Sequence, residues 1–172
     1  MIRTSAVALL LAASVAGAQQ TNGTNGTRLT PPPKAVAGTA VVVSKAQFSS
    51  LRWLEGTWRG TGGGVPAFAE GYKFTNDSTI QISFYADSTA MKVSTTGTLV
   101  LTAGQLFYTG NGTEYVATKI APTSITFVPK GTNGKNVFEW TMNSPTEWTA
   151  SLKGGTGEVT PPVVTYTMAK IR

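Results

Sequence analysis

From Leu54 onward, apolar and polar residues alternate with a period of two, and clusters of Gly, Asn, Pro or Asp interrupt the alternation roughly every 8–12 residues. Ile80, Ile82 and Phe84, for example, occupy alternate positions. Successive side chains of a β-strand point to opposite faces, so this pattern predicts short, half-buried strands joined by tight turns. No regular succession of strand and helix occurs, which argues against a parallel sheet. The sequence therefore predicts an all-β, antiparallel fold.

The predicted strands are spread along the whole chain after residue 67. They cover residues 68–74, 80–84, 91–93, 99–101, 106–108, 115–117, 125–127, 138–142, 148–152 and 164–168, and a further strand carries residues 56–58. Short connections favour an up-and-down order, and such a sheet removes its exposed edges by closing on itself. We therefore expect an up-and-down β-barrel of roughly 8–10 strands, with an open sandwich as the alternative.

One short segment has helical spacing. Ser44 is a candidate N-cap for residues 45–54, in which Phe48, Leu51 and Leu54 fall on one face. Because this segment lies directly before the first strand, we expect a short N-terminal helix that plugs one end of the barrel.

The first residues are typical of a signal peptide. A basic start is followed by an apolar run and by Ala16-Gly17-Ala18, which predicts cleavage after Ala18. Residues 19–43 are rich in Pro, Gly and Thr and predict a disordered leader, so the barrel domain is expected over 44–172. No later run reaches about 20 apolar residues, so we expect no transmembrane anchor and an exported product, periplasmic or secreted. An outer-membrane β-barrel is an alternative that would need outward apolar bands and aromatic girdles.

Two absences restrict the chemistry. The chain has no Cys and no His, which excludes thiol nucleophiles, disulfides, a Ser-His-Asp triad and His-ligated haem, and removes most zinc and iron sites. We therefore expect no cofactor, no metal and no assigned catalytic residue. The net charge of +6 comes from basic residues scattered along the chain without a basic run, which does not predict nucleic-acid binding.

The segment that leads into the first strand carries a motif. Gly56-Thr57-Trp58 ends the stretch from Leu51 to Trp58, which has the form L-x-W-L-x-G-x-W. This opening resembles that of the calycin superfamily, which includes lipocalins, fatty-acid-binding proteins and nitrobindins, and is most similar to lipocalin-like domains of bacterial exported proteins. The resemblance implies that Trp58 plugs the closed end of the barrel and that a basic residue near the chain's end, Arg172 or Lys170, packs across its ring. Nitrobindins bind haem through a His, which this chain lacks.

A barrel of this size is able to hold one small ligand, and such sites are mostly apolar with a few polar groups. We therefore expect a small hydrophobic or amphipathic molecule in the lumen, although each aromatic residue has plain core packing as its alternative. The candidate ligand-binding residues are Glu70, Tyr72, Phe84, Tyr108, Tyr115, Lys119, Phe138, Trp140, Trp148 and Tyr166.

Two of these candidates are charged. Glu70 lies between Phe68 and Tyr72 on an otherwise apolar face, where a buried carboxylate needs a basic partner or a ligand; the alternative is that this face meets solvent. Lys119 is four positions from Tyr115, so on a regular strand the two side chains would share a face and Lys119 would reach into the lumen. The alternative is a lysine on the surface. A barrel without a cavity above roughly 300 Å³ would favour a packed structural or interaction domain. An enzyme using Glu70 and a Tyr as acid and base is a third alternative.

Overall fold

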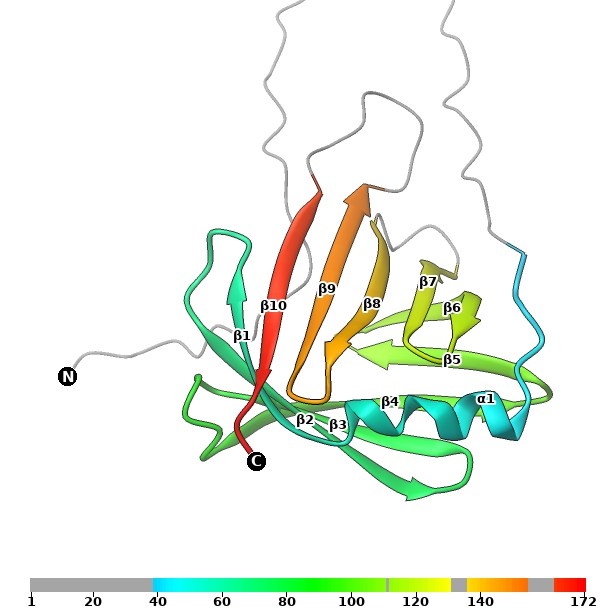
Figure 1. Cartoon of the computed structure of the whole chain (residues 1–172), viewed down its shortest axis with the longest axis horizontal. Helices are drawn as coiled ribbons and strands as arrows, with labels where there is room; N and C mark the ends of the chain where they lie inside the picture. Colours follow the sequence, from blue (N-terminus) through cyan, green and yellow to red (C-terminus); the bar gives the residue numbers. More distant parts are fainter. Residues whose placement is uncertain (1–38, 111, 131–135, 155–162) are drawn as a thin grey trace, which may run out of the picture.

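The computed structural model describes residues 39–110, 112–130, 136–154 and 163–172 of the chain. The signal peptide predicted for 1–18 and most of the leader predicted for 19–43 lie outside the described residues. In the described part, ten antiparallel strands close into a barrel behind one short helical segment (Figure 1). The prediction of an all-β, up-and-down barrel is therefore confirmed.

Each strand pairs with its neighbours in the sequence, and β1 closes the barrel against β10, with Trp58 opposite Lys170. The strands are β1 (Gly56–Gly62), β2 (Phe68–Asn76), β3 (Thr79–Tyr85), β4 (Val93–Thr102), β5 (Gln105–Gly110), β6 (Thr113–Ala121), β7 (Ser124–Pro129), β8 (Asn136–Ser144), β9 (Glu147–Gly154) and β10 (Val164–Lys170).

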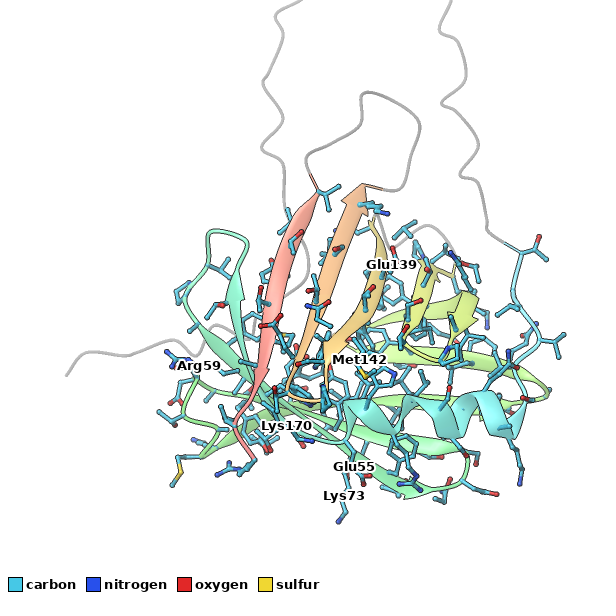
Figure 2. All side chains as sticks on the ribbon, in the orientation of Figure 1. Glu55, Arg59, Lys73, Glu139, Met142 and Lys170 are labelled. Carbon is cyan, nitrogen blue, oxygen red and sulfur yellow. The ribbon has the colours of Figure 1, made fainter. Side chains whose placement is uncertain are left out.

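The predicted alternation sets which side chains face inward. Ile80, Ile82 and Phe84 of β3 are all buried, and alternate residues from other strands join them in one continuous core. Figure 2 shows Arg59 and Lys73 pointing away from the barrel, as their positions on the other face require. Burial of this apolar face is the main driving force for closure.

One stretch of the strand assignment was wrong. Of the strand predicted over 91–93 only Val93 is in a strand, and it belongs to β4, which also contains the strand predicted over 99–101. Met91 precedes it and is 81% exposed, and Val93 is itself 45% exposed. The pairing of β3 with β4 shifts register next to Tyr85, so the alternation of β4 does not continue into the 86–92 connection.

The helical segment covers one end of the barrel, as predicted. It consists of α1 (Lys45–Ser49) and the 3₁₀ turn η1 (Ser50–Leu54), which cross the foot of the barrel in Figure 1. Ser44 and Gln47 form a capping box at its start, which satisfies N–H groups that the helix leaves unpaired. Phe48, Leu51 and Leu54 are fully buried. Neither α1 nor η1 is long and apolar enough to cross a membrane.

Trp58 lies at this covered end and is 1% exposed. Its Nε1 donates to the carbonyl of Leu54 at 2.7 Å, and Nζ of Lys170 lies 5.1 Å from the ring centroid. Lys170 is thus the basic residue that packs across the indole. A side chain on Gly56 would clash with Cε of Lys170, and its φ of 132° favours glycine, which explains why Gly56 precedes this site.

Arg172, the other candidate for the partner of Trp58, does not pack across the indole, so that part of the prediction was wrong. Its guanidinium donates instead to the carbonyl of Ala90 at 2.6 Å. The reason is the register of the two strands, in which Lys170 is paired with Trp58. Arg172 lies beyond the end of β10, and its backbone carbonyl accepts a hydrogen bond from the N–H of Thr57.

Candidate functional site

A small cavity lies inside the barrel. Its volume is about 20 Å³, which is room for about one water molecule. Strands β2, β5, β8, β9 and β10 contribute its walls, so it depends on closure of the barrel. The lining residues are Phe68, Glu70, Tyr108, Trp140, Trp148, Ala150, Tyr166 and Met168.

Glu70 is the one lining residue with a carboxyl group. It lies on the inward face of β2, and Tyr72, two positions along, donates from its hydroxyl to Oε2 of Glu70 at 2.5 Å. Burial raises the pKa of Glu70 from 4.5 to about 7, and the hydrogen bond from Tyr72 opposes part of that rise. Glu70 is half-buried by exposure and lines the cavity, so its side chain lies on the inner face of the barrel and not on the outer one. A pKa of about 7 means that the carboxyl titrates near neutral pH.

No basic side chain accompanies this carboxyl in the described part of the chain. The four ion pairs found there join Lys45 to Asp77, Arg52 to Glu55, Lys130 to Glu114 and Lys153 to Glu139, all at the surface. Every Lys and Arg among the described residues is exposed. Apart from its bond with Tyr72, Glu70 makes no side-chain hydrogen bond with a described residue, which leaves Oε1 free to accept one.

The prediction that Lys119 reaches into the lumen was wrong. A β-bulge shifts the register of β6 between Ala117 and Lys119. Lys119 is paired with Thr126, while the next pair, Ile120 with Ile125, faces the core. The extra residue in the bulge reverses the parity on which the prediction depended, so Lys119 lies exposed on the outside.

Aromatic rings form most of the wall around Glu70. Four of the predicted residues line the cavity beside it: Tyr108, Trp140, Trp148 and Tyr166. Burial raises the pKa of Tyr108, and the nearby Glu70 raises it further, so this phenol stays neutral. Nε1 of Trp148 is buried and has no hydrogen-bond partner among the described residues. An unpaired buried donor lowers the stability of the fold. This N–H group is a second polar group in the cavity wall, besides the carboxyl of Glu70.

Four other predicted residues are inward-facing but do not line the cavity. Tyr72 lies next to it and holds Glu70. Phe84, Tyr115 and Phe138 are core residues, and the rings of Tyr115 and Phe138 are 4.7 Å apart. Phe84, Tyr115 and Phe138 therefore pack in the core, as the alternative to lining a ligand site predicted.

Sequence reasoning missed three lining residues: Phe68, Ala150 and Met168. The signal was present, because each lies two positions from a residue that was predicted, namely Glu70, Trp148 and Tyr166. Residues two apart on a strand share a face, so the same parity would have included them.

Two rings limit the cavity next to the turn between β1 and β2. Phe68 is half-buried, and its ring packs edge-on against Tyr166, with the centroids 5.6 Å apart. A methyl group on Gly60 would overlap the ring of Phe68, and one on Gly63 would overlap the ring of Tyr166. The two glycines therefore make the room in which these rings lie.

Two solved β-barrel structures are similar to this chain at low sequence identity. No protein-family model matches the chain, and a search of curated proteins found no match. Among solved structures, a redesigned β-barrel, b11L5F_LGL, matches 70% of this chain and 93% of its own, at 14% identity and a TM-score of 0.34. EF1p2_mFAP2b bound to DFHBI matches 73% of this chain and 99% of its own, at 15% identity and a TM-score of 0.33.

Both TM-scores lie below 0.5, so no property of either protein is carried over to this chain. The barrel implied by the calycin resemblance is present. Membership of the lipocalin family stays a prediction.

Proposed function

We propose that the barrel is a binding protein that holds one small amphipathic molecule at the Glu70 cavity. The observation that carries this proposal is a carboxyl group inside the barrel with no basic partner among the described residues. The aromatic wall would contact the apolar part of the ligand, and Glu70 would contact its polar part.

The cost of this carboxyl argues for a role beyond packing. Burying an ionisable group without a charged partner destabilises a fold, and replacing such a group by an apolar one is often neutral or stabilising. Its one hydrogen bond, from Tyr72, offsets only part of that cost. Groups with strongly shifted pKa values inside a cavity are typical of functional sites.

The cavity is too small to hold a ligand unless the barrel opens. Small-molecule sites usually measure about 300–1,000 Å³, far more than the space found here. Entry therefore requires the rings of Phe68 and Tyr166 to rotate away from each other. Phe68 is the half-buried ring of this pair, and it packs edge-on against Tyr166, so we place the entry of a ligand at this contact.

A packed structural barrel is the second candidate, and the small cavity favours it. In that case the interior would be filled by its own rings, and the domain would act through its outer surface. This candidate leaves the cost of Glu70 unexplained, which is why we place it second.

The test measures binding to the full chain by tryptophan fluorescence, because Trp140 and Trp148 line the cavity. A panel of short-chain alcohols, amines and carboxylates and a fluorescent fatty acid serve as probes. We expect saturable binding of at least one probe, faster association for Phe68→Ala, and loss of binding for Ala150→Phe, which fills the cavity. If neither the natural chain nor Phe68→Ala binds any probe, the packed barrel replaces this proposal.

The place of action is a separate proposal. The signal-peptide pattern of residues 1–18 supports export, which would make the ligand a molecule of the cell envelope or the surroundings. Detection of an exported chain that begins at Gln19 would support this proposal.

A further inference from the structure

We infer that the Glu70 cavity selects a small protonated amine, whose ammonium group donates to Oε1 of Glu70 while aromatic rings surround its carbon chain. This inference rests on the proposed binding function and adds the charge of the ligand. It follows from two features of the cavity, namely its one carboxyl group, which has no described basic residue beside it, and its aromatic wall.

The first feature is the free oxygen of the carboxyl group. Tyr72 donates to Oε2, so Oε1 is the atom left to accept from a ligand. All described Lys and Arg side chains are exposed, and Glu70 has no cation inside the barrel. An ammonium group on the ligand would supply both the missing hydrogen-bond donor and the missing positive charge. Hydrogen bonds between charged groups are stronger than those between neutral groups.

The second feature is the composition of the wall. Five of the eight lining residues are aromatic, and the remaining apolar ones are Ala150 and Met168. Aromatic rings attract cations over their faces, more strongly when water is excluded. Once the rings of Phe68 and Tyr166 have rotated apart, the same wall would contact a short hydrocarbon chain and bury it by the hydrophobic effect. An alkylammonium ion matches both properties.

Other ligand classes fit this chemistry less well. An anion would meet the charge of Glu70 with no basic group beside it. Divalent metal ions take several oxygen ligands, and in the described part of the chain no group of three His, Cys, Asp or Glu residues is placed to hold one. A neutral alcohol would bond to the carboxyl group but would leave its charge uncompensated.

The titration of Glu70 gives the inference a second readout. Its pKa of about 7 means that lowering the pH from 8 to 5.5 reduces the ionised fraction roughly 30-fold. The other titratable groups around it are phenols, Tyr72 on β2, Tyr108 on β5 and Tyr166 on β10, and each has a raised pKa and stays neutral over this range. Amine affinity should therefore fall on acidification, whereas alcohol affinity should change little.

The experiment compares butylamine, butan-1-ol and butanoate, which share one chain length, by tryptophan fluorescence and calorimetry on the full chain at pH 8 and pH 5.5. We expect butylammonium to bind at least ten-fold more tightly than butanol at pH 8, and butanoate not to bind. Glu70→Gln should abolish the preference for the amine while butanol still binds. Glu139→Gln, which removes a carboxyl from the outer surface, is the matched control and should leave the preference unchanged.

The outcomes separate the two proposals. Equal affinities for butylamine and butanol in the natural chain, or an amine preference that survives Glu70→Gln, would overturn the selection of a cation and leave the binding function in place. Failure of all three probes to bind, in the natural chain and in Phe68→Ala, would overturn this inference. If every probe of the wider panel also failed to bind both chains, the binding function would be overturned with it.

Discussion

Tyr72 and Glu70 lie two positions apart on the inward face of β2, and the phenol of Tyr72 donates to Oε2 of Glu70 at 2.5 Å. This bond fixes one carboxylate oxygen and leaves the other to the cavity. The inward face of one strand thus supplies both the acid of the site and the group that positions it. Both residues were predicted as site residues, while their contact follows from the face they share.

Glu70→Gln should stabilise the barrel above neutral pH. Since the pKa of Glu70 is raised on folding, the folded chain holds this proton more tightly than the unfolded chain, so stability is lost as the pH rises from about 4.5 through about 7. The penalty at pH 8 is up to about 3 kcal/mol. Urea unfolding of both chains at pH 4.5 and pH 8 measures it, and a stability difference independent of pH would contradict the burial of this charge.

Tyr72→Phe should raise the pKa of Glu70 above its natural value of about 7. The variant removes the hydrogen bond from Tyr72, and this bond stabilises the ionised form of the carboxyl group. NMR titration of the ¹³C-labelled carboxyl of Glu70 measures this pKa. Tyr166→Phe is the matched control, since Tyr166 lines the same cavity without a hydrogen bond to Glu70. The pKa should move in the first variant and stay within experimental error in the second.

Lys170→Met should lower the free energy of unfolding by about 0.5–1 kcal/mol, because it removes the cation over Trp58 and keeps an apolar stem beside the ring. Lys73→Met removes an exposed lysine that makes no ion pair with the described residues, and should change stability by less. Thermal unfolding followed by tryptophan fluorescence compares the two. Equal effects would mean that Lys170 contributes only surface charge.

The sequence predicted the barrel because period-two alternation is a local property that each strand expresses by itself. The closure of β1 on β10 and the burial of Trp58 followed from that pattern and from the Gly56-Thr57-Trp58 motif. Parity failed where a bulge adds a residue. Nothing in the residues around Lys119 indicates that bulge, because it arises from the pairing of β6 with β7.

The size of the lumen was beyond sequence reasoning for a different reason. Alternation gives the same inward positions whether the interior is packed or hollow, and the difference depends on how rings from distant strands fill the space. Tyr108 and Phe138, for example, lie 5.3 Å apart across the core from β5 and β8. The cavity beside Glu70 is what these packed rings leave, so a lumen sized for an ordinary ligand could not be assumed.

Gly60→Ala should push the ring of Phe68 out of its place against β1. The added methyl group would overlap that ring, which is the far end of a side chain at the edge of the wall, so the strain is relieved by rotation away from Tyr166. We expect a loss of roughly 1–3 kcal/mol of stability, as is common for overpacking. The same rotation is the one proposed to admit a ligand, so this variant should also bind probes with faster association.

A double-mutant cycle with Phe68→Leu identifies the cause of that loss. If the methyl group acts through the ring of Phe68, Gly60→Ala should cost much less in the Phe68→Leu background, and the two changes should be non-additive by more than about 0.5 kcal/mol. Additive effects would mean that the strain lies in the backbone of β1 itself. The ring of Phe68 would then not be held by the space at Gly60, and rotation of that ring would lose its support as the route into the cavity.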